Sequence, residues 1–550
     1  MKFKVYAKIK RSLLLFLVFV FTIGSFPIVS KADSSLFTDV PNDHWASEHI
    51  YKLKELNITS GVGDNQFGIG QTLTRAEFVT FLCKLMKWEI IENSESIFSD
   101  NSDSSEWFFP YINTAQKHNV ITDSDDVFRP RDAITRREMA VMMINAIGYN
   151  ELARDLNSDK SYFDDVTEDI GFINLAKDFG LINGIDERNY GPNNTAKREE
   201  VAAILARMNN NISMEIEHKN AFYAIRSSNQ KQSINHFDSI SFGWSRYEFE
   251  DGNLILNTSA SNNNEYNTPE GYEVIISLSS NKDKLLMMAS SNEDSAKILS
   301  DSNLRRKAAE LAAEFSGNFD GVVVDFEGLK GNDLKVGLNE YLEILRANIG
   351  NKKIYVAVHP RGREDRVYFD AYDYKTIGRI ADKVILMAHD YNAKSLTEAE
   401  MNQGVIDTPI SPIKDVYYAI KAITDPNSGV EDHNKILLQI SFVSAQWKTR
   451  DGKVLNQKPF TPNYDAIMGR MNQSAELDYS KKYENPFIKF YDADDDTNNI
   501  IWYEDSRSVA AKIELAKLLN IKGISVWRLG IIPDGSSHIH MDVLSKLENY

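Results

Sequence analysis

Two acidic residues, Asp325 and Glu327, end the apolar stretch FDGVVVDFEG at residues 319–328. Alternate residues of a β-strand share one face, so both side chains point the same way as Val323. At a rise of about 3.3 Å per residue, the two carboxyl groups lie about 6–7 Å apart. Carboxylates at this spacing disfavour joint ionisation, so one pKa rises and that group can donate a proton near neutral pH. The spacing fits equally well a pair that caps the next helix or binds Arg361.

Eight apolar runs, several of them separated by helical patterns, predict an α/β fold, a (β/α)₈ TIM barrel with the two acids at the end of its fourth strand. Enzymes with this fold keep their active sites at the C-terminal ends of the strands. The predicted strands are residues 221–227, 239–245, 273–280, 319–326, 353–360, 383–391, 435–443 and 523–530. The predicted helices are residues 303–315, 334–349, 412–423 and 508–520.

Residues 444–507 predict an α+β subdomain inserted between the seventh and eighth strands. It contains the acidic run YDADDDTNN at residues 491–499. This run is either a cation site or a solvated acidic loop, and the second interpretation is favoured.

Three segments of the barrel resemble glycoside hydrolase family 18, the chitinase and endo-β-N-acetylglucosaminidase family. FDGVVVDFEG is similar to the family's DxxDxDxE signature, and LMAHDYN at 386–392 is similar to its sixth-strand Met-x-Tyr-Asp segment. GISVWRLG at 523–530 is similar to the eighth strand with its pocket-floor Trp. Residues 501–527 look especially like the branch of spore-cortex and peptidoglycan N-acetylglucosaminidases. The resemblance covers about residues 220–545.

The resemblance implies catalysis assisted by the substrate, in which the 2-acetamido group of the sugar attacks the anomeric carbon. Glu327 would be the general acid, and Asp325 would orient the acetamido group. The implied substrate-site residues are Asp320, for which a structural role is favoured, Met387, His389, Asp390, Trp527 and Tyr391, for which packing is an equal alternative. The mechanism requires no cofactor and no metal.

Two positions depart from the family pattern. Val323 stands where the middle acid of the signature is expected, so Asp325 lacks the partner that usually shares its proton. His389 stands where the sixth strand usually carries Tyr, and a histidine titrates near neutral pH. The terminal Glu of the signature, which lectin-like members typically lose, is present as Glu327.

The first part of the chain is a threefold repeat. Units begin at Phe37, Phe98 and Phe163, and each predicts a helix, a polar turn and a second helix. TRAE and TRRE open two of the second helices, with Thr74 and Thr135 as N-caps. The predicted domains are a signal peptide at 1–32, repeats at 34–95, 96–158 and 160–210, a linker at 211–220 and the barrel at 221–550.

These units resemble the S-layer homology domain, an all-α family whose three repeats form a pseudo-threefold assembly that holds a secondary cell-wall polymer, often pyruvylated. The resemblance implies polymer binding by Arg75, Arg136, Arg198, Trp45 and Trp107, with the arginines facing carboxylates from grooves between repeats. The alternative is that the arginines pair with nearby Glu residues on a helix surface. Lys197 replaces the third threonine and repeat three lacks the Trp, which predicts a weaker third groove.

Composition restricts the compartment and the partners. Five basic residues, an apolar run and VSKA at 29–32 predict a secretory signal peptide, which is favoured over a membrane anchor. Its removal takes the net charge from −17 to −23, which argues against nucleic acid and anionic lipid as partners. Cys83 is the single cysteine, and export without disulfides fits the surface of a Gram-positive-type bacterium.

The sequence therefore predicts a secreted cell-wall glycosidase that is anchored by its repeats and cleaves β-linked N-acetylglucosamine polymers. Peptidoglycan is the first choice of substrate, and a chitin-type glycan or a host N-glycan is the second. Two alternatives are a lectin-like wall- or glycan-binding protein and a structural surface-layer subunit.

Overall fold

The computed structural model describes residues 37–92, 95–122, 126–260, 265–362, 369–392, 395–535 and 538–550. The predicted signal peptide lies outside these residues. Among the helices of the described part of the chain, none is both long and apolar enough to cross a membrane.

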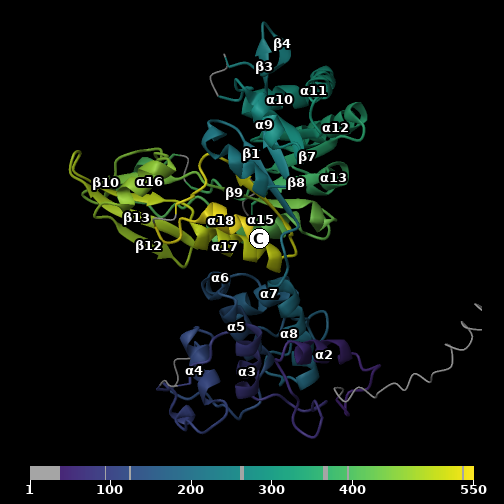
Figure 1. Ribbon diagram of the computed structural model, residues 1–550, viewed down its shortest axis with the longest axis vertical. Coiled ribbons are helices and arrows are strands. Elements are labelled where there is room, and N and C mark those ends of the chain that lie inside the picture. The colour runs from purple at the N-terminus through teal and green to yellow at the C-terminus, as the bar shows by residue number, and fades with distance from the viewer. Residues whose placement is uncertain are drawn as a thin grey trace, which may run out of the picture.

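The N-terminal part is helical, as the repeats predict (Figure 1). Each repeat contributes one pair of helices, α2 with α3, α4 with α5 and α7 with α8, and a short α6 lies between the second and third pairs. Thr74 and Thr135 form the predicted capping boxes with Glu77 and Glu138. The bounds are α2 Ser47–Glu55, α3 Arg75–Leu85, α4 Phe109–Lys117, α5 Arg136–Ala146, α6 Asn150–Asp155, α7 Ile170–Asp178 and α8 Arg198–Ile212.

The segments that precede α3, α5 and α8 close the three repeats into a ring. Antiparallel bridges join Thr72 to Lys197, Thr74 to Ala133 and Thr135 to Thr195. Each repeat therefore pairs with both of the others, which is the arrangement that a pseudo-threefold axis requires.

The second part is a closed parallel barrel of eight strands, which confirms the predicted fold class. The strand order is β2-β1-β15-β9-β8-β7-β6-β5, and pairing of β5 with β2 closes the ring. The bounds are β1 His218–Tyr223, β2 Ser239–Phe242, β5 Asp283–Ser291, β6 Gly321–Glu327, β7 Lys353–Val358, β8 Lys383–Leu386, β9 Ile436–Ser441 and β15 Gly523–Trp527.

The predicted third strand at 273–280 is wrong. Residues Tyr272–Leu278 form helix α9, and the strand is β5, which begins at Asp283. A short apolar run such as EVIISL does not separate a strand from a helix. In α9 only Ile275 is buried, whereas six consecutive residues of β5 are buried.

Helices cover the outside of the barrel, and all four predicted helices are present. The bounds are α10 Asn292–Ser300, α11 Ser302–Phe315, α12 Asn332–Ile349, α13 Tyr374–Ile380, α14 Glu398–Gln403, α15 Ile413–Ile423, α17 Ser506–Leu518 and α18 Val543–Glu548. A hairpin that the sequence did not predict, β3 Arg246–Glu250 with β4 Asn253–Asn257, extends from the end of β2.

The insertion between β9 and β15 is an α+β subdomain, as predicted, and lies to one side of the barrel (Figure 1). Its antiparallel sheet has the order β11-β10-β14-β13-β12. The bounds are β10 Ala445–Arg450, β11 Lys453–Val454, α16 Tyr464–Met471, β12 Glu476–Ser480, β13 Asn485–Asp492 and β14 Thr497–Trp502.

Helix α6 and the third repeat pack directly on the barrel (Figure 1), with α6 next to α15 and α8 next to α17. The Tyr149 hydroxyl donates to the Ala511 carbonyl at 2.8 Å, and Lys421 pairs with Asp178 at 2.8 Å. The predicted linker 211–220 is corrected, because α8 ends at Ile212 and β1 begins at His218. Residues 213–217 alone join the two parts.

Candidate active site

Asp325 and Glu327 lie at the C-terminal end of β6, the fourth strand of the barrel, as predicted. The neighbouring strand holds them in register, with Ala289 opposite Asp325 and Ser291 opposite Glu327. Asp325 is 6% exposed, whereas Glu327 is exposed at the barrel mouth. The Asp325 Oδ1 atom is buried and has no hydrogen-bond partner among the described residues.

This environment favours a protonated carboxyl group. Burial, followed by repulsion from Glu327, raises the pKa of Asp325 well above its ordinary value. The two alternative explanations of the pair find no support. Arg361 donates to the Tyr372 carbonyl at 2.8 Å, and α12 begins after Gly331 without a side-chain cap.

Val323 belongs to the apolar interior of the barrel and is fully buried. Met287, Tyr355 and Ile385 are members of the same cluster. Apolar packing therefore occupies the position where the family signature places an acid, and Asp325 has no proton-sharing neighbour on its own strand below it.

The same cluster forms the floor of the mouth. Met387 is buried in it, and Trp527 at the end of β15 packs edge-on to Phe222 with 5.1 Å between ring centroids. Tyr266 also packs against this cluster. Burial, with Asp325 and Glu327 nearby, raises the pKa of the Tyr266 phenol. Met387, Trp527 and Tyr266 therefore surround the same part of the barrel mouth as the two acids.

A hydrogen-bonded chain fixes His389 from inside the barrel. His389 Nε2 lies 2.7 Å from Gln439 Oε1, and Gln439 Nε2 lies 3.5 Å from Ser525 Oγ. Ser525 Oγ donates to Asn220 Oδ1 at 2.8 Å, and Asn220 Nδ2 donates to Ser239 Oγ at 3.0 Å. Gln439 donates through its Nε2 atom to Ser525, so its Oε1 atom is the acceptor that faces His389. His389 therefore donates through Nε2–H to Gln439.

The second nitrogen of His389 faces an acid, with Nδ1 3.5 Å from Asp390 Oδ2. Burial opposes the charged imidazole, but Asp390, the hydrogen bond to Gln439 and the charge of Glu327 outweigh it. The pKa of His389 is therefore raised above its ordinary value. Because His389 replaces the usual Tyr of the sixth barrel strand, a group that can become cationic lies near the two acids.

Two predicted substrate-site residues lie away from this region. Asp320 precedes β6 at the opposite end of the barrel, seven residues or about 23 Å of strand from Glu327, and pairs with Lys284 at 2.8 Å. The substrate-binding prediction for Asp320 is therefore corrected to a structural role. Tyr391 turns toward α15, and its hydroxyl lies 3.4 Å from the Asp415 carbonyl.

Sequence reasoning missed two residues of this region, Tyr266 and Gln439. Gln439 is a polar residue inside the apolar run KILLQISF, and that interruption is a usable signal. Tyr266 lies in a polar loop after β4, where nothing in the sequence indicates that the chain folds back over the mouth.

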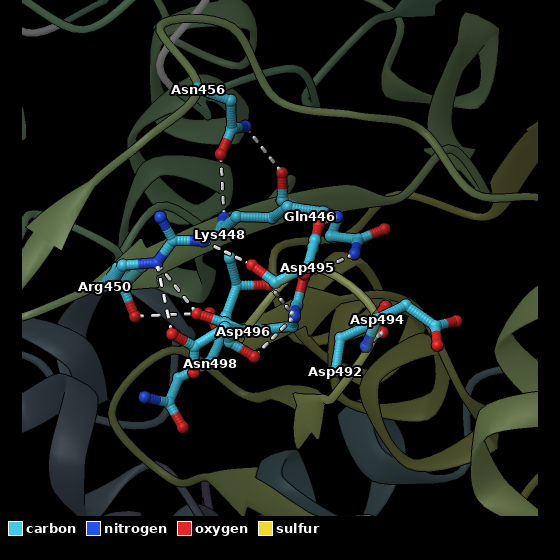
Figure 2. Close-up of polar contacts among 12 residues, drawn as sticks. Gln446, Lys448, Arg450, Asn456, Asp492, Asp494, Asp495, Asp496 and Asn498 are labelled. Carbon is cyan, nitrogen blue, oxygen red and sulfur yellow. Dashed lines mark hydrogen bonds and ion pairs between the residues drawn. The ribbon is translucent and has the colours of Figure 1, made fainter.

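The acidic run at 491–499 covers the end of β13, the turn after it and the start of β14, and Figure 2 shows Lys448 and Arg450 of β10 beside its carboxylates. Lys448 pairs with Asp495, and Arg470 pairs with Asp492 at 3.2 Å. No group of three or more acidic, His or Cys side chains among the described residues is placed to hold a metal ion. The solvated-loop interpretation therefore fits this turn.

The repeat arginines occupy two different environments. Arg75 and Arg198 are buried and pair across repeats with Glu138 and Glu77. Arg136 is half-buried and donates to the carbonyls of repeat three. Arg75 and Arg198 are predicted to face polymer carboxylates from grooves between repeats, but in the structure carboxylates of the next repeat hold their guanidinium groups inside the ring.

A groove of about 450 Å³ lies between the repeats, and Arg75 reaches its wall. Arg129, Arg137 and Arg154 line it with side chains that are partly exposed. Trp45 and Trp107 are exposed, at 60% and 52%, and neither lines this groove.

Comparison with protein families identifies both parts of the chain. The family model "Glycosyl hydrolases family 18" matches residues 207–531, which is more than half of the chain. The model "S-layer homology domain" matches residues 36–79, 97–140 and 162–202.

Individual relatives match only parts of the chain. The cortical fragment-lytic enzyme of Bacillus subtilis (strain 168) is 26% identical over 244 residues, which are 42% of this chain and 52% of that enzyme. An S-layer protein of Bacillus thuringiensis subsp. finitimus is 26% identical over 194 residues, which are 34% of this chain and 23% of that protein. This chain thus spans about half the length of the first relative and less of the second.

A solved structure shows the same barrel fold. The C-terminal domain of a putative chitinase from Desulfitobacterium hafniense DCB-2 superposes with a TM-score of 0.50 at 20% identity, over 61% of this chain and 99% of that chain. With the family models and the barrel topology, this match leads to one assignment. The chain belongs to the glycosyl hydrolases family 18 and carries three S-layer homology repeats in front of its barrel.

Proposed function

We propose that this protein is a cell-surface glycosidase that hydrolyses β-linked N-acetylglucosamine polymers, with peptidoglycan as first substrate and chitin-type glycans as second. The observation that carries the proposal is the pair at the end of β6, where a buried Asp325 with an unpartnered carboxyl oxygen adjoins an exposed Glu327. In substrate-assisted catalysis one acid protonates the leaving group and the other supports the acetamido group, and one accessible and one buried carboxyl group fit these two roles.

In the first step Glu327 donates its proton to the glycosidic oxygen while the carbonyl oxygen of the 2-acetamido group attacks the anomeric carbon. The glycosidic bond breaks, and the sugar becomes a cyclic oxazolinium ion. Asp325 accepts a hydrogen bond from the acetamido N–H through its unprotonated oxygen and so orients the attacking group. Its unpartnered Oδ1 atom is available for that hydrogen bond.

In the second step the Glu327 carboxylate accepts a proton from water, and that water opens the oxazolinium ring at the anomeric carbon. Trp527 and Met387 form an apolar surface on which the sugar packs. His389, held by Gln439, presents a hydrogen-bond donor or a positive charge toward the acids. Asp390 acts beside the Nδ1 atom of His389.

The repeats anchor the enzyme to an anionic secondary cell-wall polymer. Arg136 and the partly exposed arginines of the 450 Å³ groove support this part of the proposal, because arginine binds carboxylates in a bidentate manner. Trp45 and Trp107 offer exposed apolar contacts. Arg75 and Arg198 serve the anchor indirectly by holding the ring closed.

The activity is tested with the mature chain on purified peptidoglycan and on a chromogenic chitobioside. The wild type is expected to release reducing ends, and Glu327→Gln, which cannot donate the proton, is expected to lose at least about 10²-fold in kcat. Binding of both glycans by the wild type without turnover would replace the glycosidase with a lectin.

A further inference from the structure

A cavity of about 280 Å³ lies where the loops after β1 and β15 meet helix α16 of the inserted subdomain. It differs from the catalytic mouth, since none of its lining residues is an acid of β6 or a side chain of the apolar floor. Residues that line it include Arg226, Asn229, Asn463, Tyr464, Asp465 and Arg528.

The two arginines of this cavity are not equivalent. Arg226 is exposed and pairs with Glu265 at 2.7 Å. Arg528 is half-buried, and its hydrogen bond goes to the Leu529 carbonyl at 3.3 Å. No carboxylate among the described residues forms an ion pair with Arg528, and Asp465 stays exposed on the cavity rim.

A partly buried cation without an anionic partner is unfavourable for the folded chain. Burial lowers the pKa of the Arg528 guanidinium, and the nearby Tyr266 and Glu265 oppose this effect only in part. A bound anion would neutralise the partly buried charge of Arg528. The guanidinium geometry suits a carboxylate, which it can hold through two parallel hydrogen bonds.

The cavity adjoins the catalytic mouth. Arg528 directly follows Trp527, the aromatic side chain of the mouth floor. Tyr266 lies between the two regions, because Asp325, Glu327 and Arg528 all act on its phenol electrostatically. A glycan that packs on Trp527 can therefore place a substituent of a neighbouring sugar in the cavity.

We propose that the Arg528 cavity binds a carboxylate carried by the sugar next to the cleaved N-acetylglucosamine, and that it selects acidic glycans over neutral ones. This inference rests on the proposed function and deepens it. In peptidoglycan the carboxylate is either the lactyl group of muramic acid or a carboxylate of the peptide stem. Chitin-type polymers contain neither, so the cavity determines specificity between the two substrate classes.

The test measures binding to the mature chain carrying Glu327→Gln, so that no probe is cleaved. The probes are an alternating N-acetylglucosamine–N-acetylmuramic acid tetrasaccharide, its methylamide, its peptide-bearing form and chitotetraose. Isothermal titration calorimetry is expected to show that the acid binds about tenfold more tightly than the methylamide. Tighter binding of the peptide-bearing form would identify the stem as the source, and weaker binding would identify the lactyl group.

Adding Arg528→Gln is expected to bring the acid-to-methylamide ratio close to one, whereas Arg528→Lys keeps the charge and should keep part of the preference. Arg306→Gln removes an equal charge from an exposed position on α11 and should leave the ratio unchanged. Circular dichroism and the melting temperature confirm that each variant is folded.

Equal binding of the acid, the methylamide and the peptide-bearing form by the parent would overturn the proposal. So would an Arg528→Gln variant that keeps the preference of the parent for whichever carboxylate-bearing probe binds more tightly. A failure of hydrolysis by the wild type is a separate result, because it would contradict the glycosidase while the binding ratio still reports on the cavity.

Discussion

At the residue scale, the chemistry depends on how deeply two carboxyl groups two positions apart are buried. Asp325 is enclosed by the apolar interior, which raises its pKa, whereas Glu327 two positions later is exposed to the substrate side. Val323 increases this difference, because its side chain keeps the region below Asp325 apolar.

Replacing Asp325 is expected to stabilise the fold while it reduces activity. The pKa of Asp325 is raised in the folded state, so its ionisation destabilises the protein once the pH exceeds the unfolded value of about 3.9. Asp325→Asn should therefore melt at a higher temperature than the wild type at pH 8, with a smaller gain at pH 4, and lose at least about 10²-fold in kcat. A gain that does not grow with pH in calorimetric scans would contradict this account.

Gln439 is expected to set the alkaline limit of activity through His389. The raised pKa of His389 means that its charged form persists above about pH 6.5 and is lost as the pH rises through the folded value. Gln439→Leu removes the acceptor at 2.7 Å and should move the alkaline limb of kcat/KM about one unit lower.

The opposite substitution provides the control. Gln439→Glu places a carboxylate against Nε2–H and should move the same limb to higher pH. Titration of His389 by NMR should follow both shifts. Shifts in the same direction for the two variants would show that Gln439 affects activity only through packing.

At the element scale, the capping boxes of α3 and α5 also close the ring of repeats. Glu138 binds the amide of Thr135 and pairs with the buried Arg75 of the previous repeat. Burial opposes the charge on Glu138, but the Thr135 amide and Arg75 outweigh it and lower its pKa. The ion pair between repeats therefore stabilises the charged form.

Glu138→Gln is expected to lower the free energy of unfolding of the repeats by about 3 kcal/mol, since it leaves the Arg75 cation buried without its carboxylate. Glu200→Gln is the matched control. Glu200 accepts from the Lys197 amide at the equivalent place, but Arg136 donates to carbonyls instead. Equal losses in urea titrations of the two variants would mean that the cap, rather than the arginine, carries the energy.

Elements with a clear hydrophobic periodicity or a clear helix N-cap motif could be predicted from the sequence. The four barrel helices, the capping boxes at Thr74 and Thr135 and the end of β6 belong to this class. The run at 273–280 could not be assigned, because six apolar or small residues fit a strand and a helix equally well. Burial of Arg75 was not predictable either, since it depends on a carboxylate 63 positions away.

At the scale of the whole molecule, the third repeat serves as a docking surface for the barrel. Tyr417 and Lys421 of α15 both bind Asp178 of α7. Burial disfavours the charge on Lys421, but Asp178 outweighs it, so the pKa of Lys421 is raised. With residues 213–217 as the only covalent connection, these contacts hold the barrel in place on the anchor.

Asp178→Asn is expected to uncouple the two parts. The change removes the charge partner of Lys421 and weakens docking by about 1–3 kcal/mol, so calorimetry should show two unfolding transitions in place of one. Asp164→Asn breaks an exposed pair with Arg188 on the same repeat and should leave the profile unchanged. A single transition in both variants would show that Asp178 does not link the two parts.

The central claim is that the barrel cleaves peptidoglycan at N-acetylglucosamine with help from the substrate's own acetamido group. Mass spectrometry of the muropeptides released by the mature chain tests it most directly. The account predicts products with N-acetylglucosamine at the new reducing end, and none from Glu327→Gln. Products that end in N-acetylmuramic acid, or equal release by Glu327→Gln, would contradict it.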